Sequence, residues 1–437
     1  AFTTSSSKGW IDNVTGPDLS TISSHALRFS AKYQDDADFT ATLRINHSRS
    51  NPSNIGPIVN GFGAGGVSST GINPRVDPVT GQPLGRRQGA YNVNGEIRAY
   101  GDSANLTLTK GFGDLTLTSI SSALKGQFLN TVDVDGTNVA ALQINFANHS
   151  KEYSQDLRLS SDFSGPFDFT AGLYYFKDIA DIDTDYFIAG QSVTLAQSYR
   201  QTRTSYAAYV DATFEFGPSS TLYGGLRYTS DHGRLKRFEV VPTITLQPTI
   251  EYNDAKPSGR IGLRHKFTSD IMAYAQYSRG YRSSGFNGGA LTSAADINVA
   301  RPEFLDSYEA GIKSQFLDRK LTLNLSAFHY DYTDQQFINV VTVTSVGLVN
   351  AGRSKIDGIE AELIVRPATG LSINAGLGLL DARYKELILN GVDLSGNRLI
   401  EAPKSTMNFG LDYTAPVGSG DIAFHVDGTR ISKVFFS

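Results

Sequence analysis

Three carboxylates at alternate positions are the first residues whose spacing could support chemistry. Asp181, Asp183 and Asp185 begin like a calcium-binding loop, in which acidic side chains at every second position supply oxygen ligands. The sixth position of such a loop would be Tyr186 where glycine is needed, and the twelfth would be Ser192 where a glutamate is needed. A weak surface calcium site therefore stays open beside the simpler interpretation, a solvated acidic stretch.

The other chemical motifs are weaker. Gly61, Gly63 and Gly66 spell GxGxxG, but a dinucleotide site needs a strand before this motif and a helix after it, and the flanking residues predict a flexible loop. The seven histidines form no HExxH pair, no GxSxG occurs, and zero Cys excludes disulfides, thiolate zinc sites and cysteine nucleophiles. We predict no enzyme, with no catalytic, cofactor-binding or metal-binding residue and no cofactor.

Composition narrows the class of protein. Length alone, at 437 residues, would suggest about three soluble domains. Lys+Arg 39 against Asp+Glu 43 gives a net charge of -4, which predicts no nucleic-acid partner. Charged residues are only 19%, below the roughly 25% of soluble domains, while Gly 43 and an aromatic content of 11% are high. Apolar runs end after about half a dozen residues, whereas a membrane helix needs roughly 20.

Hydrophobic periodicity predicts an all-β chain. Leucine, isoleucine and alanine alternate with small polar residues over 371–379 and 321–327, which is the period of a strand with one apolar face. No capped helical face competes with this pattern. We predict no domain boundary within 1–437.

Turns divide the strands into hairpins. Short Gly/Pro/Asp clusters occur at 34, 111, 164, 216, 268, 317, 367 and 417, and from the second cluster onward they recur about every 50 residues. Between them we predict longer connections at roughly 49–90, 181–198, 232–253, 282–302, 334–352 and 384–403. The resulting pattern is about 16 strands of about 10 to 15 residues, joined alternately by tight turns and long loops.

This alternation favours a transmembrane antiparallel β-barrel. Outer-membrane barrels have short periplasmic turns and long extracellular loops, and a tilted strand of about 9–11 residues spans the bilayer. A kelch-type propeller also repeats near 50 residues, but each of its repeats holds four short strands. A closed barrel leaves no strand edge exposed to lipid, and its inner face can be wet.

Polar and aromatic residues are assigned to the two faces of this barrel. Eight charged residues are expected on the inner face, where they would dock a plug domain, guide a polar solute or simply be solvated: Arg158, Arg227, Arg260, Arg264, Glu309, Lys313, Glu360 and Glu362. Six tyrosines are expected near strand ends at the headgroup level: Tyr174, Tyr175, Tyr274, Tyr277, Tyr330 and Tyr332.

Several segments resemble one family. YSRGYRSSGFNGGA at 277–290 and RPEFLDSYEAGIKSQFLDRKLTLNLSAFHYDYTDQQ at 301–336 are similar to the barrel of TonB-dependent outer-membrane receptors. EYSQDLRLSS at 152–161, VNAGRSKIDGIEAEL at 349–363 and NRLIEAPKSTMNFGLDY at 397–413 resemble it too, in the order of the family. Within the first segment, Arg282, Phe286 and Asn287 could contact a ligand, but we interpret them as structural.

The resemblance implies a barrel of about 22 strands with an N-terminal plug and a TonB box. Neither the plug nor the TonB box is found in this sequence, and about six strands are unaccounted for. We therefore expect 1–437 to be an internal fragment of a longer receptor, with plug and terminal strands absent.

Family membership would place the protein in the outer membrane of a Gram-negative bacterium, as a multi-pass barrel in contact with outer-membrane lipid. Its expected function is uptake of a scarce ligand, foremost a ferric siderophore or other iron complex. The TonB–ExbB–ExbD complex would supply energy through the missing N-terminal region. Two alternatives remain: a general or substrate-selective porin, and a surface β-protein serving adhesion. The ligand-binding residues are left unassigned.

Overall fold

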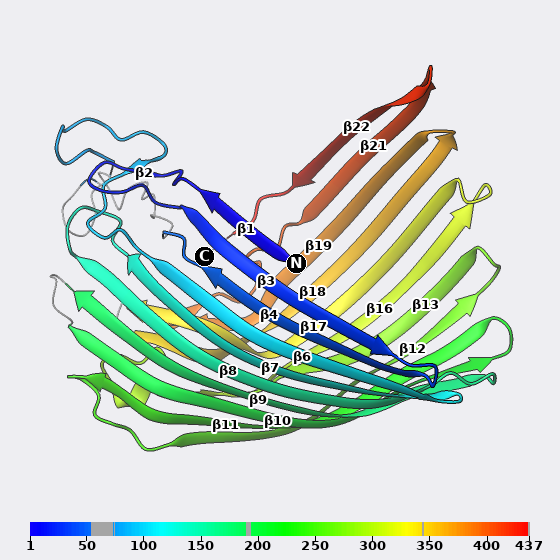
Figure 1. Cartoon of the computed structure of the whole chain (residues 1–437), viewed down its shortest axis with the longest axis horizontal. Helices are drawn as coiled ribbons and strands as arrows, with labels where there is room; N and C mark the ends of the chain where they lie inside the picture. Colours follow the sequence, from blue (N-terminus) through cyan, green and yellow to red (C-terminus); the bar gives the residue numbers. More distant parts are fainter. Residues whose placement is uncertain (54–72, 74, 189–193, 343–344, 436–437) are drawn as a thin grey trace.

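The computed structural model describes residues 1–53, 73, 75–188, 194–342 and 345–435. Most of them form one antiparallel sheet of eighteen strands, curved around an interior (Figure 1). Its strands are β1 (Phe2–Ser7), β3 (Ile22–Gln34), β4 (Phe39–Ser50), β6 (Ile97–Phe112), β7 (Leu115–Asp133), β8 (Leu142–Ser161), β9 (Phe167–Ile188), β10 (Leu195–Phe216), β11 (Ser220–Val241), β12 (Ile250–Lys266), β13 (Ile271–Arg282), β16 (Glu303–Phe316), β17 (Leu321–Thr342), β18 (Ser345–Ala368), β19 (Leu371–Leu389), β20 (Val392–Asp393), β21 (Ser405–Val417) and β22 (Gly420–Ile431).

Small elements lie in the connections between these strands. They are the parallel pair β2 (Asp12–Asn13) and β5 (Gln88–Gly89), the antiparallel pair β14 (Gly285–Phe286) and β15 (Val299–Ala300), and the 3₁₀ helix η1 (Ala294–Asp296). In the described part of the chain, no helix is long and apolar enough to cross a membrane.

The predicted all-β fold and the strand count are confirmed. Besides the short β1 and β20, the described residues form sixteen sheet strands, which contain 12 to 24 residues each. Each of the sixteen pairs antiparallel with its neighbour in the chain, from β3 with β4 to β21 with β22. β1 extends the series by pairing with β3, and no register closes the series between β22 and β1 in the described residues.

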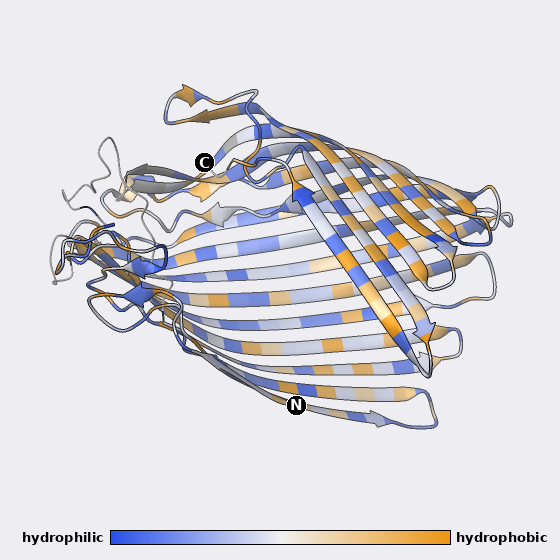
Figure 2. Cartoon of the chain, turned by 90° about the horizontal axis from the view of Figure 1, so that it is seen from above, coloured by the Kyte–Doolittle hydropathy of each residue, from blue (hydrophilic) through white to orange (hydrophobic). Residues whose placement is uncertain are grey.

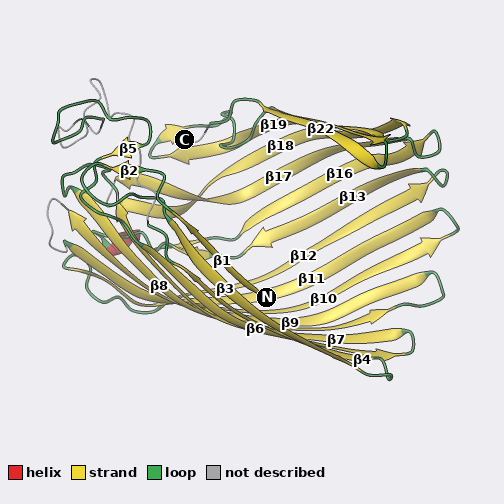
Figure 3. Cartoon of the chain, turned by 45° about the horizontal axis from the view of Figure 1, so that its top comes forward, coloured by secondary structure: helices red, strands yellow, loops and turns green. Residues whose placement is uncertain are grey.

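Tight turns and long connections lie at opposite ends of the sheet, as predicted (Figure 3). Gly113 and Gly217 sit in two of the turns with φ of 64° and 73°, a conformation that glycine adopts without a Cβ clash. At the other end, three predicted loops are wrong. Strands occupy most of 181–198, 232–253 and 334–352, because β9, β11 and β17 extend to Ile188, Val241 and Thr342.

These loops were predicted from their polar residues, but polar residues do not terminate a β-strand where the strand extends beyond the membrane. Beyond the bilayer both faces of the sheet meet water, so alternating polar side chains such as those of Asp181 and Asp183 are compatible with continued pairing. Asp181 indeed pairs in register with Arg200 on β10 and with His149 on β8. Ten of the sixteen strands, β6 to β12 and β17 to β19, are therefore longer than the 10 to 15 residues expected.

The two faces of the sheet differ in polarity, as Figure 2 shows by the alternation of colours along the strands. On β17, Leu323, Leu325 and Ala327 lie on the outer face, while Asn324 and Ser326 lie on the inner face in register with Glu362 and Glu360. The eight predicted inner charges all fall on the inner face by the same registers. Some of them bond to the wall itself, since Arg260 donates to both Asp211 oxygens at 3.0 and 3.1 Å.

The tyrosine prediction is only partly right. Tyr175 and Tyr277 lie on the outer face, where Tyr175 pairs with Tyr206 and Tyr277 with Tyr308. They belong to an outer tyrosine girdle made of Tyr153, Tyr175, Tyr206, Tyr228, Tyr277 and Tyr308. The other four predicted tyrosines face inward because strand neighbours alternate, and three of them, Tyr174, Tyr274 and Tyr332, contact charged side chains: Tyr174, Tyr274, Tyr330 and Tyr332.

Candidate ligand-binding mouth

Residues 283–302, here called the inner segment, cross the inner face of the sheet at its loop end. β12 pairs with β13 only from Gly259 to Lys266, so β13 continues beyond that point with β16 alone. The Tyr281 hydroxyl then donates to Asp231 on β11, a strand that is not a neighbour of β13. Asp231 lies four residues from the inner-facing Arg227, on the same face. The end of β13 must therefore turn inward over β12.

Buried carboxylates anchor the start of the inner segment. Asp231 and Asp254 face each other in register on β11 and β12, and both are buried. Ser284 donates its backbone N–H to Asp254 at 2.8 Å and its hydroxyl at 3.2 Å. Hydrogen bonds to an ionised acceptor are stronger than neutral ones, so this contact fixes the chain where it leaves the wall.

An apolar cluster holds the middle of the inner segment. Phe286 contacts the Tyr252 ring at 5.0 Å between centroids. The inner segment contributes Phe286, Ala290 and Leu291 to this cluster, and strands β10 to β12 with the connection after β11 contribute Leu195, Leu235, Phe238, Val240, Tyr252 and Ile244. Gln197 also donates to the carbonyl oxygens of Gly288 and Ala290 at 2.9 and 3.1 Å. A Cβ on Gly288 would lie 2.4 Å from the Tyr199 hydroxyl, so the close approach depends on glycine.

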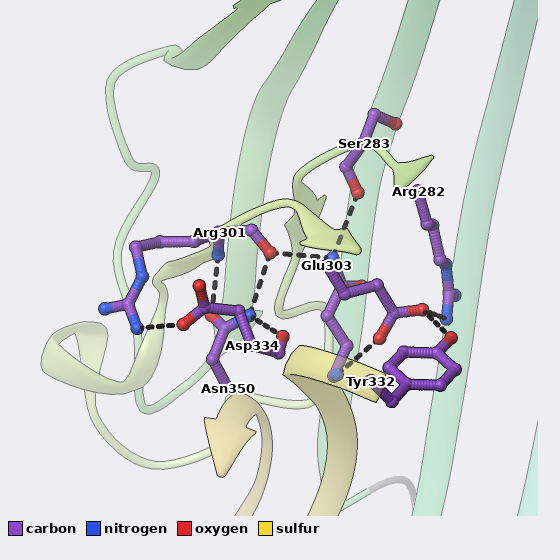
Figure 4. Close-up of polar contacts among 8 residues, drawn as sticks. Arg282, Ser283, Arg301, Glu303, Tyr332, Asp334 and Asn350 are labelled. Atoms are coloured by element: carbon purple, nitrogen blue, oxygen red, sulfur yellow. Dashed lines mark hydrogen bonds and ion pairs between the residues drawn. The ribbon is translucent and has the colours of Figure 1, made fainter. Parts of the chain in front are cut away.

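Glu303 anchors the end of the inner segment (Figure 4). Its side chain is only 5% exposed. The Tyr332 hydroxyl donates to one carboxylate oxygen at 2.9 Å, and the Gln336 backbone N–H donates to the other at 2.6 Å. Burial, followed by the bond to Glu303, raises the pKa of Tyr332 to about 12. The Gln336 side chain donates to the carbonyls of Ser283 and Arg301 at 3.0 and 2.9 Å, which ties the two ends together.

A second polar group extends this anchor toward β17 and β18. Arg301 donates its backbone N–H to the Asn350 side chain at 2.6 Å and its guanidinium to Asp334 at 2.8 Å. The Asn350 amide donates to the carbonyls of Arg301 and Asp334 at 2.8 and 2.7 Å (Figure 4). The side chains of Arg282 and Arg301 are 66% and 71% exposed, so both guanidinium groups remain open to water at the mouth.

The residues singled out in the sequence differ in their surroundings. Phe286 and Asn287 are buried, and Asn287 donates to the Asp296 carbonyl at 2.6 Å, which is what a structural role requires. Arg282 belongs to the same sequence segment, but its side chain is largely exposed. Gly61, Gly63 and Gly66 lie outside the described residues.

The alternative of a calcium loop at Asp181, Asp183 and Asp185 does not fit the geometry. Asp181, Asp183 and Asp185 lie in strand β9, where residues two apart are separated by about 6.6 Å. Both oxygens of Asp181 accept from Arg200, at 2.5 and 2.8 Å, and this lowers the pKa of Asp181. A strand cannot curl the three carboxylates around one ion. No group of three or more potential metal ligands occurs among the described residues.

A second buried cluster, missed in the sequence, joins three connections at the loop end. Ile11, Leu19 and Tyr91 form its apolar part. Asp133, at the end of β7, is only 4% exposed and accepts from the Gly136 N–H at 2.9 Å. Burial, and next the Asp135 carboxylate, raise the pKa of Asp133 to about 7. The Asp-Gly pair at 135–136 signals a turn, but no sequence pattern signals the burial of Asp133.

This raised pKa predicts a pH-dependent cluster. Between about pH 4 and pH 7, the closed cluster holds a proton that the opened form releases, so the stability of the closed form falls as pH rises. We expect the amides of 134–142 to be better protected from hydrogen exchange at pH 5 than at pH 8, after correction for intrinsic rates. Asp133→Asn should abolish the difference, and substitution of the partly exposed Asp77 (Asp77→Asn) should preserve it. A pH dependence that survives Asp133→Asn would contradict the assignment.

Comparison with known proteins identifies the family. The family model described as "TonB dependent receptor-like, beta-barrel" matches residues 30–433. The chain belongs to the TonB-dependent receptor family. It is therefore a barrel of an outer-membrane receptor, in a family of transporters and not of enzymes, and the resemblance inferred from the sequence is confirmed.

Individual relatives of this receptor barrel agree in fold. The probable TonB-dependent siderophore receptor PiuA of Acinetobacter baumannii is 24% identical over 276 residues, which cover 57% of this chain and 36% of that protein. The ferric yersiniabactin uptake receptor FyuA from Yersinia pestis superposes with a TM-score of 0.77 at 18% identity, over 99% of this chain and 63% of that one. The copper transporter OprC gives 0.68 at 14% identity, over 94% and 60%. The receptor barrel thus spans less than two thirds of these relatives.

Proposed function

We propose that this receptor takes up a scarce ligand across the outer membrane, and that the ligand is a ferric siderophore or other iron complex. The observation that carries the proposal is the inner segment, fixed at both ends across the mouth of the barrel. Such a segment narrows the entrance and offers a rigid surface to a ligand, as concave protein sites do. PiuA is described as a siderophore receptor and FyuA as a ferric yersiniabactin uptake receptor, which favours a siderophore as the cargo. OprC is described as a copper transporter, so a copper complex is the alternative cargo.

The exposed arginines of the mouth support an anionic cargo. Arg282 and Arg301 each face one carboxylate, Glu303 at 3.5 Å and Asp334 at 2.8 Å, and keep most of their surface free. Guanidinium groups bind planar oxyanions such as carboxylates in a bidentate manner. We propose that these two side chains contact the ligand first.

We also propose that further parts of the receptor complete the barrel. β1 and β22 present edge strands, and a strand edge cannot be left unpaired in lipid. Additional strands would close the sheet to about 22, and a plug domain would fill the interior that the inner charges line. A segment before the plug would engage the TonB–ExbB–ExbD complex for energy.

Uptake in cells tests this function. A strain lacking the complete gene would be grown under iron limitation, and uptake of radioactive iron would be measured with a panel of siderophores, beside copper as a separate arm. We expect loss of uptake for one siderophore class, restored by the wild-type gene and not restored in a strain without TonB. Normal uptake of every iron complex together with a loss of copper uptake would exclude an iron cargo.

Liposome swelling separates the receptor from the porin alternative. A general porin passes small sugars by diffusion, so liposomes that contain it swell without an energy source. We expect liposomes with the complete receptor not to swell. Rapid swelling with small sugars, at a rate independent of TonB, would favour a passive channel instead.

A further inference from the structure

The outer surface carries three lysines directly beyond the tyrosine girdle. Lys125, Lys151 and Lys177 lie on the adjacent strands β7, β8 and β9 (Figure 1). Lys151 and Lys177 each follow a girdle tyrosine, Tyr153 or Tyr175, by two residues toward the loop end. Lys125 pairs in register with Lys151, and Tyr153 pairs with Lys177. The three ammonium groups therefore share the outer face and one level. We call them the lysine row.

The lysine row lacks protein partners. Among the described residues, none of its three ammonium groups takes part in an ion pair or a hydrogen bond. Asp102 faces Lys125 from β6, but its carboxylate contacts the His47 ring at 2.7 Å instead. Further toward the loop end, Asp181 is held by Arg200. Lys125 and Lys151 face each other directly, and like charges in such a pair destabilise a sheet unless an anion screens them.

The opposite side of the barrel shows the contrasting arrangement. Arg279 follows the girdle residue Tyr277 by two residues, as the lysines follow theirs, but it pairs with Asp306 at 3.4 Å. Lys355 contacts Asp357 at 3.3 Å, and Arg383 contacts Asp381 at 2.9 Å. Basic residues at this level are thus neutralised by the protein on β13 to β19, whereas the lysine row is left for an external anion.

We propose that the lysine row binds the phosphate groups of outer-leaflet lipid. Tyrosines mark the headgroup level of a membrane, so side chains that follow directly beyond them meet the lipid headgroups. Long lysine side chains reach such phosphates as mobile point charges. The row would hold an anionic lipid against β7 to β9 and leave β13 to β19 without a preferred lipid.

Lipid binding to the complete receptor in detergent tests the proposal, with native mass spectrometry as the measurement. The probes are lipid A carrying both phosphates and lipid A without phosphate. The variant is Lys125→Gln/Lys151→Gln/Lys177→Gln, and the control with equal loss of charge is Arg279→Gln/Lys355→Gln/Arg383→Gln. Heat-modifiable migration verifies that each barrel is folded.

We expect the lysine variant to bind phosphorylated lipid A about a hundredfold more weakly, since each basic residue near an anionic surface contributes about a fivefold factor. The control variant should bind within about twofold of the wild type, because its removed charges are already paired. Equal losses in both variants, an unchanged affinity in the lysine variant, or equal binding of dephosphorylated lipid A would each overturn the proposal.

Discussion

Leu325→Arg is expected to lower the free energy of unfolding of the barrel by about 2–4 kcal/mol. Ser326→Arg, one residue further along β17, is expected to change that free energy little. Leu325 is on the outer face and lies midway between Leu321, next to a tight turn, and His329, in register with the girdle residue Tyr308. An arginine there would be placed near the centre of the bilayer. Ser326 faces inward and pairs in register with Glu360, which would accept the new charge.

The measurement is equilibrium folding of the complete receptor into lipid vesicles across a urea series, followed by heat-modifiable migration. Both variants carry the same added charge, so differences in net charge cannot explain a difference between them. If Ser326→Arg lost as much stability as Leu325→Arg, or more, the assignment of the two faces of β17 would be wrong.

The alternation that fixes these two faces is the part of the fold that sequence reasoning reads best. Leu371 to Leu379 alternate strictly, and the structure pairs this strand in register with β18 and β21. The prediction of the inner charges is confirmed for the same reason, because each of these residues is adjacent to an apolar neighbour that must face lipid. The prediction for the tyrosines is less accurate, because a phenol ring is compatible with both the outer girdle and the inner face. Only the alternation of side chains along β9 distinguishes the inward-facing Tyr174 from the outward-facing Tyr175.

The mouth could not be derived in this way. Nothing in the spacing of residues indicates that β13 leaves β12 at Arg279, because that depends on contacts between strands that are not neighbours. Asp231, Asp254 and Glu303 are buried acids, and burial of an acid follows from donors brought together only in the folded chain. Tyr281, Ser284 and Tyr332 supply those donors from other strands or loops.

Glu303→Ala is expected to release the end of the inner segment. The substitution removes two hydrogen bonds to a buried carboxylate, from the Tyr332 hydroxyl and the Gln336 N–H, and leaves both donors without an acceptor. Bonds to a charged group contribute about 1.5–3 kcal/mol each, so the local cost is about 3–6 kcal/mol. Hydrogen exchange of amides in 283–302 should accelerate by at least a hundredfold, while exchange in β7 and β8 should not change.

Arg282→Ala is the matched control for that substitution. It removes the third partner of Glu303, but its guanidinium is largely exposed and such an ion pair contributes about 0–1 kcal/mol. Exchange in 283–302 should therefore change less than tenfold, although ligand affinity should fall if Arg282 contacts the cargo. Equal acceleration in the two variants would mean that the ion pair with Arg282, and not the bonds from Tyr332 and Gln336, holds the inner segment across the mouth.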